Sequence, residues 1–324
     1  MKEITYAQAI NEAISEEMRR DENVFMMGED IGLYCGAFGV SRGMIQEFGG
    51  DRIMDTPIAE QAYVGAGVGA AMCGMRPIVE LMFSDFRCVC FDELVNEAAK
   101  LRFMFGGKVK VPMVMRTASG AGTGAAAQHS QSLEACLAHF PGLKVVIPST
   151  PYDAKGLLKT AIRDDNPVMF LEQKTLYRTK GMVPEEEYSI PLGQADIKLA
   201  GSDCTVVTYG RMVNTCLTAA QELEKDGVRL EVIDIRSLVP LDTQTILESV
   251  KKTKHVLIVH EAVQFCGFGA EIAGQIADSD AFYYLDAPIK RLGAKSTPIP
   301  FNPILEAETF PTVPKIVAAV KSLL

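Results

Sequence analysis

The stretch Asp55-Thr-Pro-Ile-Ala-Glu-Gln-Ala-Tyr-Val-Gly-Ala-Gly-Val-Gly-Ala-Ala-Met-Cys-Gly74 decides the fold. Pro57 fixes its own φ and biases Thr56 toward an extended conformation, whereas the residues after Glu60 are small and apolar. Such a run predicts a buried helix packed closely against its neighbours, with Glu60 at its N-terminus. A buried carboxylate needs a partner, and the local sequence offers no basic one. A cofactor nitrogen that shares a proton with Glu60 is one interpretation, and a carboxylate that caps the helix is the other.

Outward from this stretch, apolar strand-like runs alternate with helical patterns. Thr5 is predicted to be the N-cap of a helix that runs to Arg20. Strands are predicted at 24–27, 52–55, 77–82, 111–116, 144–147, 167–171, 204–209, 230–235, 255–260 and 282–285. Helices are predicted at 40–48, 58–73, 86–104, 130–139, 151–163, 213–225, 242–251 and 268–277. This alternation predicts an α/β fold with mostly parallel sheets flanked by helices.

The chain length of 324 residues favours two domains. An irregular stretch with Pro184, three consecutive glutamates and Pro191 separates two alternating regions. We therefore expect a first domain over residues 1–185, a linker over 186–200 and a second domain over 201–324.

Composition excludes several classes of function. The formal net charge of −9 disfavours nucleic acid, because phosphate backbones require basic patches. No apolar run is long enough to span a bilayer and no signal-like N-terminus is present, so we expect a cytoplasmic protein that does not enter membranes. The eight cysteines form no Cys-x-x-Cys pair and are expected to be buried, reduced thiols. The glycines at 65, 67 and 69 do not make a nicotinamide-binding motif, since residue 72 is Met where the third glycine belongs.

The whole chain resembles a known family. The motifs DTPIAEQAYVGAGVGAAMCGMRPIVELMFSDF, VPMVMRTASGAGTGAAAQHSQSLEA, PGLKVVIPSTPYDAKGLL and AIRDDNPVMFLE are similar to the β subunit of the thiamine-diphosphate-dependent first component of 2-oxo acid dehydrogenase complexes. Pyruvate dehydrogenase and the similar acetoin dehydrogenase are members of this family. The resemblance implies a transketolase-like pyrimidine-binding domain followed by a transketolase C-terminal domain.

The resemblance implies roles for four residues around the cofactor. Glu60 would contact the aminopyrimidine ring of thiamine diphosphate, and a carboxylate hydrogen-bonded there stabilises the imino tautomer that acts as a base. Phe86 would stack on the pyrimidine, while Met82 and Ile58 would supply apolar contacts. The alternative for Phe86 is ordinary core packing.

Two further residues gain catalytic roles from the resemblance. His129 ends a glycine-rich segment between a predicted strand and a predicted helix, a pliable place suited to proton transfer. The family uses the matching histidine for substrate handling and acyl transfer to a lipoyl group. Glu29, directly after a predicted strand, matches a carboxylate that connects paired active sites; the alternative is a turn glutamate.

The resemblance also implies a potassium site. Unpaired carbonyls at a helix C-terminus bind cations. In similar proteins the turn that matches Ala161, Ile162, Asp164 and Asn166 holds K⁺, together with a residue at Met113. A simple turn rich in Asp, Asn and Pro is the other interpretation.

One expected motif is missing. Thiamine diphosphate enzymes hold the diphosphate through Mg²⁺ with a Gly-Asp-Gly sequence, and Gly50-Asp-Arg52 is the nearest match here. We therefore expect an α subunit to supply that half of the site in an α₂β₂ heterotetramer, with a lipoyl acyltransferase core as acceptor.

The substrate stays open. The motifs Phe-Ser-Asp-Phe, Met-Phe-Gly-Gly at 104–107 and Pro-Ser-Thr-Pro-Tyr-Asp at 148–153 lean toward acetoin, pyruvate is nearly level, and branched-chain 2-oxo acids come third. Two rival hypotheses are a self-sufficient transketolase-like enzyme, which would need its own diphosphate motif, and a non-catalytic assembly subunit, which would not need both Glu60 and His129.

Overall fold

The computed structural model describes residues 1–324, which divide into two compact units. The first unit comprises residues 1–119 and 136–192, and the second comprises residues 120–135 and 193–324. The division differs from the single predicted boundary in one respect: the segment around His129 belongs to the second unit although its flanking sequence belongs to the first. Helix α5 (Glu134–Ala138) spans one of these crossings.

The first unit is built on a parallel sheet. Its strands run in the order β6-β7-β5-β4-β2-β3, and every pairing among them is parallel. A short antiparallel ribbon joins β1 to β8. The elements are β1 (Lys2–Thr5), α1 (Tyr6–Arg20), β2 (Val24–Gly28), α2 (Met44–Phe48), β3 (Ile53–Asp55), α3 (Glu60–Met72), β4 (Arg76–Phe83), the 3₁₀ helix η1 (Ser84–Cys88), the π-helix η2 (Glu93–Ala98), α4 (Leu101–Met104), β5 (Val114–Ser119), β6 (Lys144–Val146), α6 (Pro151–Arg163), β7 (Val168–Gln173), η3 (Lys174–Leu176) and β8 (Lys180–Val183).

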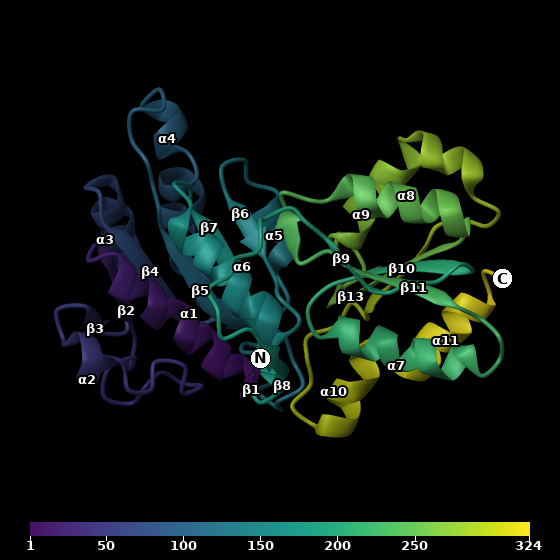
Figure 1. Cartoon of the computed structure of the whole chain (residues 1–324), viewed down its shortest axis with the longest axis horizontal. Coiled ribbons are helices and arrows are strands. Elements are labelled where there is room, and N and C mark those ends of the chain that lie inside the picture. Colours follow the sequence, from purple (N-terminus) through teal and green to yellow (C-terminus); the bar gives the residue numbers. More distant parts are fainter. The chain divides into compact units, whose positions relative to one another are not determined.

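The second unit repeats the architecture. Strands β14-β13-β10-β11-β9 form a sheet that is parallel except for the antiparallel edge strand β9. Helices α8 and α9 cover one face of this sheet and α7 and α11 cover the other (Figure 1). The elements are β9 (Asp196–Leu199), β10 (Cys204–Thr208), α7 (Met212–Glu224), β11 (Leu230–Asp234), β12 (Ser237–Val239), α8 (Thr243–Thr253), β13 (Val256–Val263), α9 (Gly269–Ala277), η4 (Asp280–Tyr284), β14 (Lys290–Ala294), α10 (Pro303–Thr309) and α11 (Val313–Lys321). The predicted fold class is thus confirmed.

Local sequence explains where several elements begin. The Thr5 side chain accepts a hydrogen bond from the Gln8 N–H, and the Gln8 side chain accepts from the Thr5 N–H, a complete capping box at the start of α1. Helix α6 begins at Pro151 after the cap residue Thr150, as predicted. Helices α1 and α6 pack side by side on the first sheet (Figure 1).

Three predicted elements differ from the structure. Residues 282–285 are not a strand: Ser279 accepts the Ala281 N–H and starts the 3₁₀ helix η4, and the strand at this position in the sheet is β14. The predicted helix over 86–104 is divided among η1, η2 and α4; the buried Arg87 side chain donates to the Ser84 carbonyl at 2.7 Å, a local bond that favours a tight turn. The predicted linker over 186–200 contains β9, which pairs with β11.

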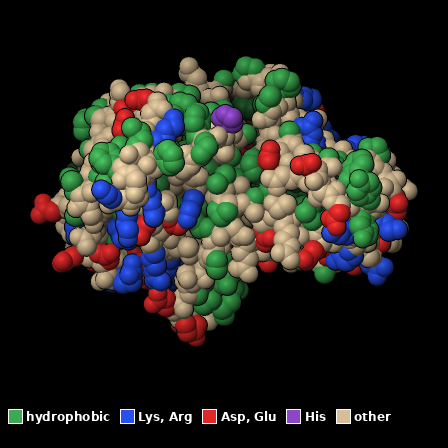
Figure 2. All heavy atoms as spheres, turned by 90° about the horizontal axis from the view of Figure 1, so that it is seen from above, with side chains coloured by type: hydrophobic (Ala, Val, Ile, Leu, Met, Phe, Trp, Pro, Cys, Tyr) green, Lys and Arg blue, Asp and Glu red, His purple; other side chains and the backbone are tan.

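The surface is mixed in character. None of the helices has the length and apolar composition that crossing a bilayer requires. On the face drawn in Figure 2, acidic and basic side chains are interspersed with hydrophobic groups. All eight cysteines are free, but only Cys90, Cys204 and Cys216 are buried, so the expectation of buried thiols is wrong for Cys35, which is half-buried, and for the exposed Cys73, Cys88, Cys136 and Cys266.

Candidate active site

Glu60 is the first residue of α3 and is buried, with 9% of its surface exposed. The N-cap residue is Ala59, which provides no side-chain cap, and the Glu60 carboxylate forms no hydrogen bond or ion pair within the chain. A carboxylate in such a place is costly unless a partner satisfies it. The structure therefore places Glu60 at the N-terminus of the helix, as predicted. Its carboxylate can accept a hydrogen bond from a donor outside the chain.

The helix that carries Glu60 lies close to the sheet because of a glycine. A β-carbon added at Gly67 would come within 2.7 Å of Val79 Cγ2 on β4. Only glycine permits this approach without movement of the neighbouring strand. The small residues that the sequence places after Glu60 thus fix the distance between α3 and β4.

Glu29 lies beside Glu60. The residue follows β2, and its carboxylate accepts a hydrogen bond of 3.2 Å from the hydroxyl of Tyr63 on α3. Burial, and then the negative charge of Glu60, raise the pKa of Glu29 above its ordinary value, while the Tyr63 bond opposes them. Two predicted residues from separate parts of the sequence are therefore brought together by the fold.

The predicted apolar contacts lie on the same unit. Met82 is in β4 and Phe86 is in η1 directly after it, and both are partly exposed. The Phe86 ring meets Phe83 edge-on, with ring centroids 6.3 Å apart, so its position is fixed by an aromatic contact. Ile58, in the loop before α3, is 81% exposed. An apolar side chain this exposed is available to a ligand or to another chain.

A buried row of charges crosses the first sheet, and the sequence analysis missed it. Arg116 on β5 donates two hydrogen bonds to Glu172 on β7, at 2.8 and 2.6 Å, and a third to Glu80 on β4. Burial opposes the charged form of Arg116, but the carboxylates of Glu172 and Glu80 outweigh it and raise its pKa. Burial also raises the pKa of Glu80; the Arg116 charge opposes this, and the charges of Glu172 and Glu29 add to it. The available signal was that all three charges interrupt apolar strand runs.

His129 belongs to residues 120–135, which we call the His129 segment. Three hydrogen bonds tie the backbone of this segment to the rest of the second unit. Glu261 on β13 accepts the Ala121 N–H at 2.6 Å, and Glu306 on α10 accepts the N–H groups of Gly122 and Gly124 at 2.8 and 3.2 Å. His129 itself is partly exposed. The structure thus presents an accessible imidazole on a firmly held backbone.

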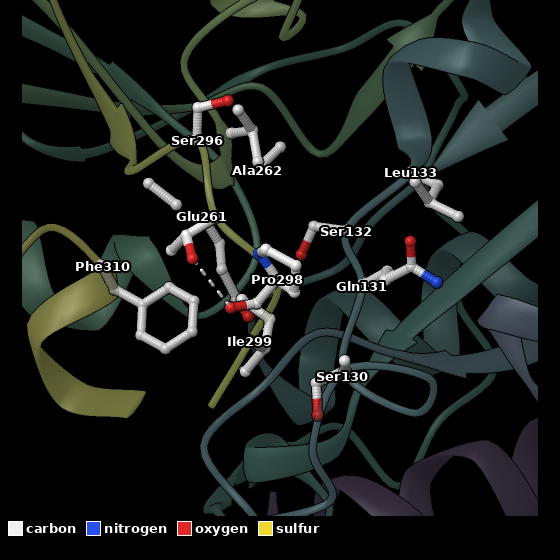
Figure 3. Close-up of a pocket in the computed structure, with 14 residues that line it drawn as sticks. Ser130, Gln131, Ser132, Leu133, Glu261, Ala262, Ser296, Pro298, Ile299 and Phe310 are labelled. Atoms are coloured by element: carbon white, nitrogen blue, oxygen red, sulfur yellow. Dashed lines mark hydrogen bonds between the residues drawn. The ribbon is translucent and has the colours of Figure 1, made fainter. Parts of the chain in front are cut away.

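A cavity of about 360 Å³ borders the His129 segment within the second unit. Figure 3 shows Gln131 and Ser132 on one side and Ile299 and Phe310 on the other. The complete lining comprises Ala127, Ser130, Gln131, Ser132, Leu133, Glu261, Ala262, Val263, Ala294, Ser296, Thr297, Pro298, Ile299 and Phe310. Its volume falls within the range of small-molecule sites.

The predicted potassium turn is already supplied with donors. Arg76 Nη1 donates to the carbonyls of Ile162 and Asp164, both at 3.0 Å. The Asp164 N–H bonds to the Ala161 carbonyl, and the Val168 N–H bonds to the Met113 carbonyl at 2.9 Å. The Asn166 side chain donates to Asp164 and accepts from Arg102 at 2.6 Å. The fold gathers the turn, while Met113 is wholly buried directly before β5. A cation there would use the second lone pairs of these oxygens.

A buried histidine in the second unit has an unusual environment. His260 is fully buried in β13, and its Nδ1 lies 3.0 Å from the Ala262 carbonyl. A donor is needed at Nδ1, so Nε2 carries the lone pair, and Nε2 has no hydrogen-bond partner. Burial lowers the pKa of His260 to about 4.

Comparison with known proteins decides the family. The chain matches the family model of the transketolase pyrimidine-binding domain over residues 2–180 and that of the transketolase C-terminal domain over residues 193–316. It is 50% identical to the acetoin:2,6-dichlorophenolindophenol oxidoreductase subunit beta of Bacillus subtilis, with 99% of this chain and 97% of the relative covered.

The chain belongs to the β subunits of the thiamine-diphosphate-dependent first component of 2-oxo acid dehydrogenase complexes. This β subunit is also 48% identical to the pyruvate dehydrogenase E1 component subunit beta of Rickettsia felis, with 99% of this chain and 98% of the relative covered. It is 46% identical to the 2-oxoisovalerate dehydrogenase subunit beta of Bacillus subtilis, with 100% and 99% covered. The predicted family is confirmed, and with it an oxidoreductase subunit.

Family membership implies thiamine diphosphate as cofactor and an α subunit as partner in a tetramer. Among solved structures, the β subunit resembles a split-gene transketolase described as an inactive beta4 tetramer, with a TM-score of 0.80 at 21% identity over 99% of this chain and 98% of that one. This likeness supports the fold.

Proposed function

We propose that the β subunit supplies the pyrimidine half of a split thiamine diphosphate site and acts with an α subunit on acetoin or pyruvate. The observation that carries this proposal is the Glu60 carboxylate, which is buried at the start of α3 without a partner in the chain. The aminopyrimidine ring offers a nitrogen whose proton such a carboxylate would share. When bound, thiamine diphosphate supplies the nucleophilic carbon that cleaves the bond beside a carbonyl.

The surrounding residues fit this ring. Phe86, Met82 and Ile58 offer accessible apolar surface for a flat heterocycle, with Phe86 stacking on it. Glu29 and Tyr63 lie next to Glu60, and the Tyr63 hydroxyl donates a hydrogen bond to the Glu29 carboxylate. His129 would handle the substrate and the transfer of the acyl group to a lipoyl group on an acyltransferase core.

The diphosphate half is assigned to the partner. The chain lacks the Gly-Asp-Gly sequence that would place Mg²⁺ on the phosphates. Large exposed apolar side chains occur on both units, among them Phe103, Met104, Phe265, Tyr283 and Phe301. Such surface is typical of subunit interfaces and supports assembly with an α subunit. We also propose that the turn with Ala161, Ile162, Asp164 and Asn166, together with Met113, binds K⁺.

The substrate is proposed as acetoin first and pyruvate second. The two acetoin relatives are 50% and 49% identical and the pyruvate relative is 48% identical, so the order depends on a small margin. Dye reduction by the complex reconstituted with its α subunit, Mg²⁺ and thiamine diphosphate, with acetoin and pyruvate compared, would settle it. Faster turnover of a branched-chain 2-oxo acid would contradict both choices.

The role of Glu60 has its own test. In Glu60→Gln the shape is retained but the acid is lost, and we expect dye reduction to fall by roughly 100-fold or more. Glu97→Gln, at an exposed carboxylate on η2, is the matched control and should be fully active. Calorimetry of thiamine diphosphate binding gives a readout besides activity, and Glu60→Gln should bind it more weakly. Full activity of Glu60→Gln in the assembled complex would favour the non-catalytic assembly subunit instead.

A further inference from the structure

The His129 segment is held by a carboxylate from a distant part of the chain. Glu306 Oε1 accepts the Gly122 N–H at 2.8 Å, and its Oε2 accepts the Gly124 N–H at 3.2 Å. The two partners are separated from Glu306 by 184 and 182 residues. One carboxylate therefore engages two alternate backbone donors on the same loop.

The backbone of the segment makes this geometry possible. Gly120, Gly122 and Gly124 have φ values of +80°, +96° and +68°, and Ala126 has φ of +61°. These left-handed conformations favour glycine and turn alternate N–H groups toward one side, where they form an anion-binding concavity. Ala126 adopts the same region without the freedom of glycine, so the surrounding contacts hold it there.

The carboxylate depends on the loop as much as the loop depends on it. Glu306 is 4% exposed and forms no ion pair with a lysine or arginine. A buried carboxylate must be compensated by hydrogen bonds. The Glu306 side chain accepts them from the N–H groups of Gly122 and Gly124. If the loop left this arrangement, the carboxylate would lose both donors.

A second anchor fixes the start of the segment. Glu261 accepts the Ala121 N–H at 2.6 Å and also binds Arg211 Nε. The Arg211 guanidinium lies over the Phe310 ring, 4.8 Å from its centroid. Phe310 directly follows α10, the helix that carries Glu306. The two anchors therefore belong to one connected network within the second unit.

We infer that Glu306 is the positioning residue for His129. It acts through the backbone of residues 122–124 and sets the place of the imidazole. The inference rests on the proposed role of His129 in the reaction. Because catalysis depends steeply on the placement of reacting groups, weakening the Glu306 hydrogen bonds to Gly122 and Gly124 should reduce turnover on the order of 10- to 100-fold.

The test is Glu306→Gln in the complete α₂β₂ complex. The glutamine keeps one acceptor, but its amide group turns a donor toward the second N–H. Glu308→Gln is the matched control, since Glu308 lies on the same helix and is 65% exposed. Acyl transfer is measured for both variants, and again with each combined with His129→Ala. Hydrogen exchange of peptides from the His129 segment is followed in parallel.

We expect Glu306→Gln to slow turnover about 10-fold or more alone, less than about 2-fold in the His129→Ala background, and to speed exchange of the segment. Equal losses in both backgrounds would show a merely structural role and overturn the inference, as would unchanged exchange. Full activity of His129→Ala would instead refute the proposed function of His129. The exchange result would still test whether Glu306 holds the His129 segment in place.

Discussion

Replacement of Gly67 by alanine tests the close approach of α3 to the sheet. The added β-carbon would lie 2.7 Å from Val79 Cγ2 and 3.4 Å from Met113 Sδ. Val79 is buried in β4, which lies between β2 and β5 in the sheet, so it has little freedom to move away. Gly69 on the same helix is the natural control, because its β-carbon would have nothing within 4 Å.

The magnitudes follow from two opposing effects. Gly→Ala within a helix stabilises by about 1 kcal/mol, and this gain applies to both positions. Overpacking costs about 1–3 kcal/mol and applies only at Gly67. Gly69→Ala should therefore be more stable than the original chain by up to about 1 kcal/mol, and Gly67→Ala should be less stable by up to about 2 kcal/mol.

Thermal unfolding of the two purified variants would measure this difference. For a unit of this size the Tm difference is roughly 2–4 °C per kcal/mol. Gly67→Ala should also lose activity in the assembled complex beyond its loss of stability, because Glu60 lies seven residues before Gly67 and moves with the helix. Equal stabilisation by both variants would refute the close approach of α3 and β4, and with it the account of how Glu60 is placed.

Two further predictions concern buried charges. Arg116→Met leaves the carboxylates of Glu80 and Glu172 buried without their cation, so the free energy of unfolding should fall by about 3–5 kcal/mol in denaturant titrations; a change under about 1 kcal/mol would contradict the charge row. The pKa of His260 is about 4 in the folded chain against an ordinary 6.5, so the unfolded chain binds a proton at the higher pH. The free energy of unfolding therefore falls as the pH drops from 6.5 to about 4, by roughly 3 kcal/mol in all. His260→Phe should remove this acid-dependent loss between pH 6.5 and 4, and an unchanged slope would show that other groups cause it.

The features that sequence predicts well are local ones. The start of α3 at Glu60 follows from Pro57 and the small residues beyond it, and the start of α1 follows from Thr5 and Gln8. Each depends on residues within a few positions of one another. The aromatic run at 282–285 was misleading for the same reason: Tyr283 is 86% exposed, and the cap at Ser279 outweighs its strand propensity.

Contacts between residues that are far apart in the chain could not be predicted from the sequence. Glu80, Arg116 and Glu172 each interrupt an apolar strand, but only the parallel register brings them together. Gly122 and Glu306 are 184 residues apart, and nothing near either one indicates the other. A glycine-rich loop is read from its own sequence as pliable, and the acceptors that hold its N–H groups lie elsewhere in the chain.

The interleaving of the two units has a consequence for synthesis. Because residues 120–135 belong to the second unit, no single cut of the chain separates the units into complete pieces. A fragment that ends at residue 192 would carry the loop amides without Glu261 and Glu306, and its complement would carry both carboxylates without these amides. On the ribosome, Gly122 emerges 184 residues before Glu306, a delay of roughly 10–40 s at ordinary elongation rates. The histidine loop must therefore wait for its bonds to Glu306 until nearly the entire polypeptide has been made.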